Sequence, residues 1–522
     1  MILTQSLRRA RQMRGAEPAV IYADRVTDWT RLVDRIARLA AALRGLGMGP
    51  GDRVALLAHN SDRTIESYFA PLWGGGVFMP LNARLAEPEL ASQIADAEPM
   101  ALLVDEAHLD LGRRLAAVMT AGAPLVYAGE GDAPVGTLSY EGLIAGATPI
   151  EDAARGADEM ACLFYTGGTT GRGKGVMLSH QNLFANALNV VGPFAMDETT
   201  VHLHTGPLYH LGAGARVYGA TVAAATHVVL PRYDAAETLA TIAKHKVTLA
   251  TFVPTMLGMM LHHPAFGSHD LSSLKLITYG AAPMPEALLV ELMRRLPGVR
   301  FAQSYGMTEL SPVATVLTPR FHTVEGPDAG HLRSGGRAAL LAEVKIVDAG
   351  DQEVPLGTVG EIAVRGPMVM LGYWRQPEAT AQALRGGWMH TGDAGFMDEA
   401  GFVTVVDRIK DVIISGGENV YSIEVEDTLH QHPAIDQCAV FGIPDPLWGE
   451  RVHAVVSLKS GQAADPLALI EHCRARIAHY KCPKTLDIHP GRLPLSGANK
   501  IDKTALRALY RQPADPSQTT GP

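Results

Sequence analysis

The spacing of apolar residues predicts alternating helices and short strands over the first two thirds of the chain. After Trp29, apolar residues recur at helical spacing with arginines between them, so one helix face would be buried and the other wet: Leu32, Ile36, Leu39 and Leu43. Short apolar runs then alternate with helical stretches, at 54–57, 101–104, 162–165, 227–230, 247–252 and 274–279. This alternation is typical of β-α-β units and predicts mainly parallel sheets flanked by helices.

The pattern changes after about Gly335 and again at Asp407. Between these points, apolar runs separated by short turns with Gly and Asp predict antiparallel hairpins, at 343–347, 360–364 and 402–406. Beyond Asp407 the pattern predicts a small α+β unit, with helices from Ser422, Pro466 and Asp502 and strands at 438–442 and 453–458. The polar, proline-containing segment 511–522 has nothing to bury, and we expect it to be disordered.

Composition and charge narrow the classes of protein. The 522 residues correspond to about three domains, and a chain with 47% hydrophobic and 19% charged residues is globular. The net charge of −9 disfavours a nucleic-acid partner. Four cysteines without the close pairing of a zinc site indicate a reducing compartment, and no uncharged run approaches the roughly 20 residues of a membrane helix. We therefore expect a cytoplasmic protein with no transmembrane segment and no bound nucleic acid.

The strongest chemical signal is a glycine- and threonine-rich segment at 165–176, directly after an apolar run. Its glycines allow close approach of the backbone to a ligand, its hydroxyls donate hydrogen bonds, and Lys174 adds positive charge, a combination suited to a polyphosphate. The alternatives are a flexible surface loop or the loop of a P-loop NTPase. The second alternative lacks its metal-binding Ser or Thr, because Gly175 follows the lysine. The candidate binding residues are Thr166, Gly167, Gly168, Thr169, Thr170, Gly171 and Lys174.

A second segment, 303–310, offers groups that ATP would need. Glu309 could hold Mg²⁺, which prefers hard oxygen ligands, while Thr308 could donate to a phosphate and Tyr305 could stack on a base. Together the two segments resemble the ANL superfamily of adenylate-forming enzymes. Seven further motifs follow in the family's order, at 280–283, 360–362, 372–374, 391–393, 407–411, 415–419 and 493–500.

The resemblance implies a role for each motif. Asp393 would bind the ribose hydroxyls with help from Arg408, and Lys500 would be the catalytic lysine of adenylation. Lys410 would lie in a hinge, 407–411, between an N-terminal domain, 1–406, and a mobile C-terminal domain, 412–510. The nucleotide would also contact Gly280, Ala281, Ala282, Pro283, Tyr305, Gly306 and Thr308, and Thr166 would act beside Mg²⁺ with Glu309. The expected fold is α/β of the ANL type, with a small β-rich subdomain in the large domain.

The resemblance also implies two further sites. Gly416 and Gly417 would line a tunnel for the pantetheine of CoA, although the pair is equally typical of a tight turn. His210 would position or gate the acid, and Gly212, Gly280 and Met307 would line the acid pocket. The small residues after His210, including Gly214, could instead pack a helix against a sheet. Glycines at 168 and 173 and Asn499 depart from the family's usual residues.

These observations predict an acyl-CoA synthetase. ATP, a carboxylic acid and CoA would give acyl-CoA, AMP and pyrophosphate through an acyl-adenylate, with Mg²⁺ as the metal. Medium- or long-chain fatty acids are the expected substrates, and hydroxycinnamates or other aryl acids are the alternative. The motifs also leave open a luciferase-like oxygenase or a degenerate nucleotide-binding relative. A homodimer and transient contact with a membrane surface remain open as well.

Overall fold

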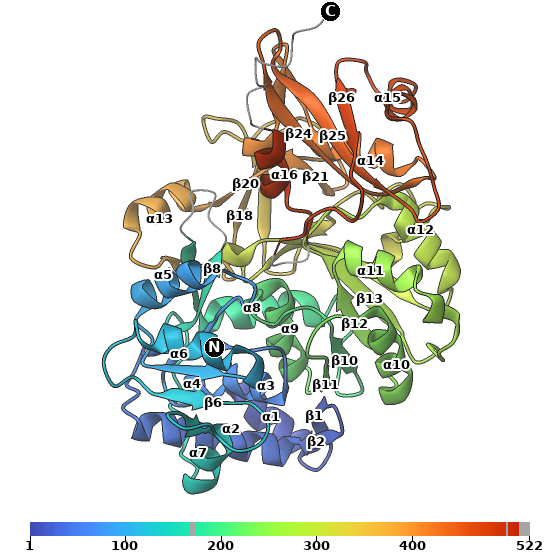
Figure 1. Cartoon of the computed structure of the whole chain (residues 1–522). Helices are drawn as coiled ribbons and strands as arrows, with labels where there is room; N and C mark the ends of the chain where they lie inside the picture. The colour runs from blue at the N-terminus through green and yellow to red at the C-terminus, as the bar shows by residue number, and fades with distance from the viewer. Residues whose placement is uncertain (167–172, 497–499, 511–522) are drawn as a thin grey trace, which may run out of the picture.

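The structure is a computed structural model that describes residues 1–166, 173–496 and 500–510 (Figure 1). The strands of the described residues form four sheets. Two large sheets and a smaller antiparallel sheet are built from residues before Ile409, and a separate small sheet follows near the C-terminus. This arrangement agrees with the predicted α/β fold, in which large, mainly parallel sheets and a small β-rich subdomain precede a small C-terminal unit. The tail at 511–522, for which disorder is predicted, lies outside the described residues.

The first large sheet is built on parallel strands. Its order is β16-β15-β14-β13-β12-β10-β11-β1-β2, and the pairs between β14 and β1 are all parallel. Strands β2, β15 and β16 add antiparallel edges. The strands are β1 (Pro18–Tyr22), β2 (Arg25–Asp28), β10 (Val201–His204), β11 (Thr226–Val229), β12 (Leu249–Phe252), β13 (Leu276–Gly280), β14 (Arg300–Gly306), β15 (Val313–Leu317) and β16 (Arg337–Ala338).

The second large sheet carries the glycine-rich segment at one side. Its order is β19-β9-β8-β4-β3-β5-β6-β7, parallel from β8 to β7 and antiparallel at the β8–β9 hairpin and at β19. The strands are β3 (Arg53–Leu57), β4 (Val77–Pro80), β5 (Ala101–Val104), β6 (Leu125–Tyr127), β7 (Leu138–Ser139), β8 (Met160–Thr166), β9 (Lys174–Ser179) and β19 (Gly372–Tyr373). The parallel runs predicted for both sheets are thereby confirmed.

Helices cover these sheets and fill the space between them. Helix α8 packs against α9 and contacts both large sheets, through β9 and β15. In α2 the predicted stripe of Leu32, Ile36, Leu39 and Leu43 is buried. The helices are α1 (Gln5–Arg14), α2 (Trp29–Gly45), α3 (Asp62–Ser67), α4 (Ala70–Trp73), α5 (Glu87–Ala97), α6 (Leu109–Ala116), α7 (Tyr140–Gly146), α8 (His180–Val191), α9 (Leu211–Val222), α10 (Ala235–His245), α11 (Pro254–Leu261), α12 (Glu286–Arg295) and α13 (Pro377–Ala383).

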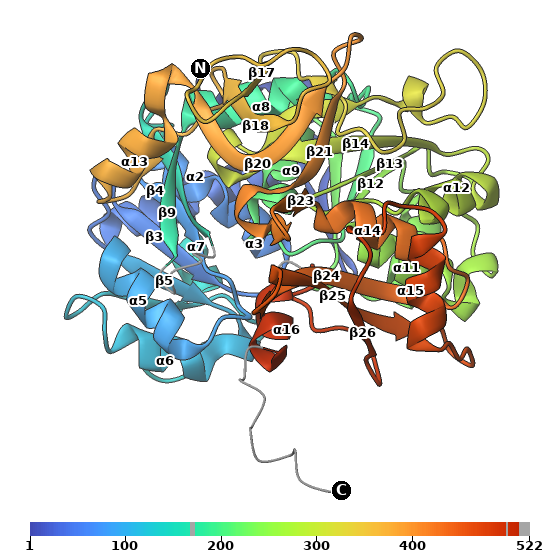
Figure 2. The ribbon, with the colours of Figure 1, turned by 90° about the horizontal axis from the view of Figure 1, so that it is seen from above.

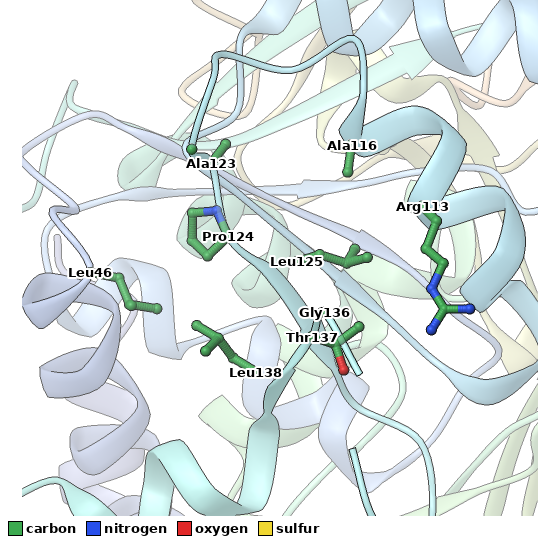
Figure 3. A pocket seen from close by; sticks show the side chains of 10 residues that line it. Leu46, Arg113, Ala116, Ala123, Pro124, Leu125, Gly136, Thr137 and Leu138 are labelled. Carbon is green, nitrogen blue, oxygen red and sulfur yellow. The ribbon is translucent and has the colours of Figure 1, made fainter. Parts of the chain in front are cut away.

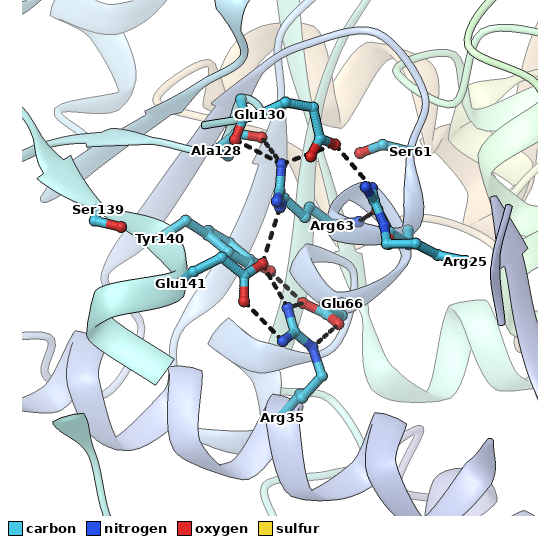
Figure 4. A network of polar contacts seen from close by, with 12 residues as sticks. Arg25, Arg35, Ser61, Arg63, Glu66, Ala128, Glu130, Ser139, Tyr140 and Glu141 are labelled. Atoms are coloured by element: carbon cyan, nitrogen blue, oxygen red, sulfur yellow. Dashed lines mark hydrogen bonds and ion pairs between the residues drawn. The ribbon is translucent and has the colours of Figure 1, made fainter. Parts of the chain in front are cut away.

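An ionic network joins helices α2, α3 and α7 in the N-terminal part of the chain (Figure 4). Arg35 of α2 bonds to both Glu66 of α3 and Glu141 of α7, with an Nη1–Oε2 distance of 2.8 Å to Glu141. Arg63 also contacts Glu141, and the Tyr140 hydroxyl donates to Glu66. Burial opposes ionisation of Glu141, but the two arginines outweigh it and lower the pKa of Glu141 to about 2.

The third sheet and the C-terminal unit follow the predicted change of pattern. The third sheet is antiparallel throughout, in the order β17-β18-β20-β21, which confirms the predicted hairpins. Its strands are β17 (Glu343–Val347), β18 (Gly360–Arg365), β20 (Met389–Met397) and β21 (Val403–Arg408). The C-terminal unit contains β22 (Ile413–Ser415), β23 (Glu418–Val420), α14 (Ser422–His430), β24 (Ile435–Asp445), β25 (Gly449–Leu458), α15 (Pro466–Arg474), β26 (Thr485–Ile488) and α16 (Lys503–Tyr510).

The C-terminal unit lies against the large domain, with α14 near α12 in both views (Figures 1 and 2). It has its own apolar core, in which Val425 and Leu429 of α14 pack with β24 and β25. Helix α16 begins where the sequence predicts, because Asp502 accepts hydrogen bonds from the amides of Thr504 and Ala505. Within the described residues, none of the helices combines the length and apolar character that a membrane crossing needs.

Candidate active site

The centre of the candidate site is a buried carboxylate, that of Asp393 on β20. Arg408, its partner in the neighbouring strand β21, places Nε 2.6 Å from Asp393 Oδ1. The hydroxyl of Tyr305, at the end of β14, donates to Asp393 Oδ2 at 2.7 Å. Burial raises the pKa of Asp393, while the charge of Arg408 and the Tyr305 hydrogen bond oppose that rise. A carboxylate held in this way can accept hydrogen bonds from two vicinal hydroxyls.

Lys500, in the C-terminal unit, lies near enough to this carboxylate for the two charges to interact. Two backbone contacts hold its main chain: Ser496 N–H donates to the Lys500 carbonyl, and Leu495 pairs with Ile501. Burial and the positive charge of Arg408 lower the pKa of Lys500 to about 8, while Asp393 opposes that shift. The structure thus brings the predicted catalytic lysine near Asp393 of the large domain and Arg408 of the predicted hinge, about a hundred positions earlier in the chain.

Glu309, the predicted metal ligand, is buried beside these groups. The Tyr373 hydroxyl donates to Glu309 Oε1 at 2.8 Å, and Met370 N–H donates to the Glu309 carbonyl. Burial raises the pKa of Glu309, and the Tyr373 hydrogen bond and the charges of Arg408 and Lys174 oppose this. Lys174 lies over the Tyr373 ring, with Nζ 4.6 Å from its centroid. One carboxylate and two cations therefore share this part of the site.

The glycine-rich segment is described only at its two ends. Thr166 and Lys174 are paired across the β8–β9 hairpin, where the Thr166 hydroxyl lies 3.4 Å from the Lys174 carbonyl oxygen. Both residues are partly buried. The other five predicted phosphate-binding residues, Gly167, Gly168, Thr169, Thr170 and Gly171, lie outside the described residues, and so does Asn499.

The turn at 280–283, predicted to contact the nucleotide, begins at the last residue of β13. Gly280 ends the strand opposite Ser304, and a Cβ on Gly280 would lie 2.3 Å from the Ser304 carbonyl oxygen. Only glycine allows this close approach of the two strands. Ala281, Ala282 and Pro283 continue the turn at or near the surface. Gly306 ends β14, and Met307 and Thr308 follow it on the way to Glu309. All three are partly buried.

The predicted hinge residue Lys410 is exposed in a short turn, Ile409–Asp411. Contacts on either side of it join this turn to the C-terminal unit. Asp407 Oδ2 accepts from Ser422 N–H at 2.6 Å, at the start of α14. Arg507 of α16 pairs with Asp411, with an Nη1–Oδ1 distance of 2.7 Å. The exposed lysine therefore lies between two points at which the C-terminal unit is held.

Gly416 and Gly417 form the turn between β22 and β23, and both are exposed. Gly416 packs against the Trp448 ring, since a Cβ there would lie 2.9 Å from it. Gly417 has nothing within 4 Å of its Cβ position. The tight turn weighed in the sequence is therefore present. This turn lies in an exposed hairpin. The charges of Asp393, Arg408 and Lys500, by contrast, act on one another.

Two of the residues predicted for the acid site, His210 and Gly212, lie at the start of helix α9. The His210 carbonyl accepts from the amides of Ala213 and Gly214, and its ring centroid lies 4.9 Å from that of Tyr209. Gly212 is exposed, with open space at its Cβ position. Gly214 is different, because a Cβ there would lie 1.9 Å from the Tyr68 hydroxyl oxygen. Gly214 therefore allows α9 to pack closely against Tyr68. This agrees with the packing role that the sequence offered as the alternative to lining the acid pocket.

Sequence reasoning missed two polar residues of this region. Tyr373 lies in the motif at 372–374, but nothing in its local sequence predicts the hydrogen bond to Glu309. Arg216 is buried in α9 and donates to Ser304. A signal for Arg216 exists, because it is the single charged residue in the stretch Leu211–Val222. Such a charge among apolar and small residues points to a buried guanidinium.

Two other features of the surface are separate from these residues. A hollow lined by Leu46, Arg113 and the segments 122–125 and 136–138 contains none of the predicted site residues (Figure 3). His59, Asp105 and His108 form a group of potential metal ligands. The oxygens of Asp105 already accept from the backbone amides of both histidines and from His108 Nδ1, which explains the group as a capped turn.

Comparison with known proteins identifies the family. Residues 7–374 match the AMP-binding enzyme family, and residues 424–500 match its C-terminal domain. The chain belongs to the AMP-binding enzyme family. It is therefore a member of the ANL superfamily and an AMP-forming acid–thiol ligase of the acyl-CoA synthetase type, which activates its acid with ATP through an acyl-adenylate.

Relatives of this ligase share nearly its whole length. A feruloyl-CoA synthase from Amycolatopsis sp. is 40% identical over 97% of this chain and 98% of its own. A medium/long-chain-fatty-acid–CoA ligase from Mycobacterium tuberculosis is 34% identical over 95% of this chain and 87% of its own. The crystal structure of ATP-bound MatB from Rhodopseudomonas palustris superimposes with a TM-score of 0.87 at 31% identity, covering 98% of this chain and 99% of that one.

Proposed function

We propose that this ligase acts on hydroxycinnamates or related aryl acids and transfers their acyl groups to CoA. The observation that supports this substrate class is the 40% identity with a feruloyl-CoA synthase, against 34% with a fatty acid ligase. The fatty acids first expected from the sequence are thus less well supported than the aryl alternative. The reaction consumes ATP and CoA and releases AMP and pyrophosphate.

The grouping of charges around Asp393 supports a role in adenylation. An oxygen of the acid attacks the α-phosphorus of ATP, a P–O bond forms, and the bond to pyrophosphate breaks. Two anions must approach each other, so the cations Lys500 and Lys174 stabilise the charge that develops. We assign the ribose hydroxyls to Asp393, which Arg408 and Tyr305 hold in place.

The carboxylate of Glu309 fits a magnesium ion. It is a hard oxygen donor in a buried position, with Tyr373 fixing one oxygen and Lys174 nearby for the phosphates. When bound, Mg²⁺ would neutralise phosphate charge. We assign Thr166, at the mouth of the glycine-rich segment, to the same phosphates.

The second half-reaction needs access for a thiol. The CoA sulfur attacks the acyl carbon, a C–S bond forms, the bond to AMP breaks, and the thiol proton is released. We assign Gly416 and Gly417 to the pantetheine route after the C-terminal unit turns about Lys410. Their exposure on a hairpin supports this assignment, because the Gly417 side leaves room that a side chain would fill.

The test is to identify the nucleotide product. The protein is incubated with ATP, Mg²⁺ and CoA, together with benzoic, cinnamic and hydroxycinnamic acids or with short to long fatty acids, and the nucleotides are separated by chromatography. We expect AMP and an acyl-CoA with the aryl acids, and none with Lys500→Ala. AMP only with fatty acids would overturn the substrate class. ADP, or no acid-dependent product, would overturn the ligase assignment.

A further inference from the structure

Arg216 is a buried cation to which the described part of the chain offers no counter-ion. The side chain, in the second turn of α9, is 4% exposed. Its Nη2 donates to the Ser304 hydroxyl at 2.9 Å, and its guanidinium lies 5.0 Å from the centroid of the Phe194 ring. Among the described residues, Nε and Nη1 have no hydrogen-bond partner, and no carboxylate pairs with Arg216. Burial lowers the pKa of Arg216 to about 10, so the group stays charged at neutral pH.

The sheet beneath Arg216 is polar although it is buried. His202 of β10 lies close enough for the charge of Arg216 to act on it, and its Nε2 lies 3.2 Å from the Thr251 hydroxyl of β12. Thr251 in turn bonds to Thr278 of β13 at 2.7 Å. His202 Nδ1 also has no partner within the described chain. A long alkyl chain would gain little by packing against this surface. It offers no hydrogen bonds to the polar groups of the protein that it would cover.

The position of Arg216 connects this polar surface with the predicted acid pocket. Gly212 lies one helical turn earlier on the same face of α9, and the space at its Cβ position is open. At the other end of the side chain, Ser304 Oγ is 3.2 Å from the Cβ position of Gly280. Arg216 therefore lies between two residues that the sequence assigns to the substrate.

We propose that Arg216 binds an oxygen substituent of the acid, at the end farthest from the carboxylate that is activated. This proposal rests on the proposed function. The free N–H groups would donate to a phenolic or methoxyl oxygen of an aryl acid. A buried guanidinium that lacks partners is unfavourable in the free protein, and a ligand that supplies acceptors relieves this cost. The selected substrates are then ring-oxygenated aryl acids, and cinnamic acid without ring oxygens is a poor substrate.

A purely structural role predicts something different. Packing against Phe194 and the single bond to Ser304 would hold the helix equally for every acid. Loss of the side chain would then lower activity on all acids by the same factor. A recognition role changes the ratio between acids, so the ratio separates the two explanations.

The experiment compares kcat/KM for ferulic, 4-hydroxycinnamic and cinnamic acids in wild type, Arg216→Met and Arg216→Lys. Wild type should prefer the oxygenated acids about 10- to 100-fold, as expected for a charged hydrogen bond. Arg216→Met should bring the ratio close to one with cinnamic acid little changed, and Arg216→Lys should retain part of the preference. Thr221→Val is the control on the same helix, since it removes the contact with His227 and should leave the ratio unchanged.

Binding gives a second readout that does not depend on turnover. Non-hydrolysable sulfamoyl analogues of feruloyl- and cinnamoyl-adenylate are titrated into the same proteins, whose folding is checked by thermal melting. Arg216→Met should weaken only the feruloyl analogue. An equal loss for both analogues, or a wild type that activates aryl acids without preference for ring oxygens, overturns the role of Arg216 but not the aryl ligase. Activation of unsubstituted fatty acids alone overturns both.

Discussion

Arg408 and Asp393 face each other across strands β20 and β21, with Arg408 Nε 2.6 Å from Asp393 Oδ1. Asp393 is buried and Arg408 is half exposed, so the arginine supplies charge at the border between the large domain and solvent. Burial alone would favour the neutral acid, whereas ribose recognition needs the carboxylate. With Asp393 in its proposed role at the ribose, this pair would couple nucleotide binding to the ionisation of one buried group.

Replacing Arg408 should weaken ATP binding in a pH-dependent way. In Arg408→Gln the pKa of Asp393 rises further, so protonation of the carboxylate extends to higher pH. We expect KM for ATP to increase about tenfold at neutral pH, in line with one charged hydrogen bond, and by more at pH 6. The control is Arg385→Gln. Arg385 is another arginine near the same sheet, and it pairs with Asp351 and Glu361. A KM that is raised equally at all pH values would contradict this coupling.

The charge of Lys500 should limit adenylation in alkaline solution. Its pKa is lowered to about 8, so the positive charge is nearly complete at pH 6 to 7 and is lost as the pH rises through about 8. The kcat/KM for acid-dependent pyrophosphate exchange should therefore fall above about pH 8. Lys500→Arg should remove this fall, whatever its absolute rate. An unchanged profile in Lys500→Arg would assign the fall to another group.

The two half-reactions should depend on Lys500 differently. Lys500→Ala should abolish adenylation, because the cation beside Asp393 and Arg408 is lost. Thioester formation from supplied acyl-AMP should be largely preserved, since that step needs no attack of one anion on another. The measurements are pyrophosphate exchange and release of acyl-CoA from acyl-AMP. Equal loss of both activities would rule out a separate role for the C-terminal unit in each step.

A bulky side chain on the β22–β23 turn should impair the thiol step alone. Gly417→Trp fills the open space at that turn and should lower acyl-CoA formation from acyl-AMP by about tenfold or more. Pyrophosphate exchange should remain near the wild-type rate. Gly461→Trp is the matched control, because Gly461 also has a positive φ in an exposed turn of the C-terminal unit. If exchange fell with thioester formation in Gly417→Trp, the tunnel assignment would be wrong.

Gly214 should affect stability rather than substrate choice. Gly214→Val places methyl groups against the Tyr68 hydroxyl, where even a Cβ would overlap, so we expect the free energy of unfolding to fall by about 1–3 kcal/mol. Gly212→Ala, two residues earlier in open space, should leave it unchanged or raise it slightly. Denaturant titration measures both. Similar effects of the two substitutions would contradict the packing role of Gly214.

Local patterns in the sequence determined most of the fold. The strand at β5 was predicted at its observed residues, and the helix starting at Ser422 begins where it was expected. The change at Asp407 marks the passage into the C-terminal unit, which Asp407 itself contacts through Ser422. These features depend on residues close together in the chain, and periodicity and turn residues report on them directly.

The sequence by itself therefore determined the elements, the family and the chemical groups available, including Asp393, Glu309 and Lys500. Only the tertiary structure decided which distant groups meet: Lys500 with Asp393 and Arg408, Tyr373 with Glu309, and Arg216 with Ser304. It also decided that Gly214 serves packing against Tyr68. The physical reason is that spacing along the chain fixes local geometry, whereas partners separated by tens or hundreds of residues are chosen by the packing of sheets and helices.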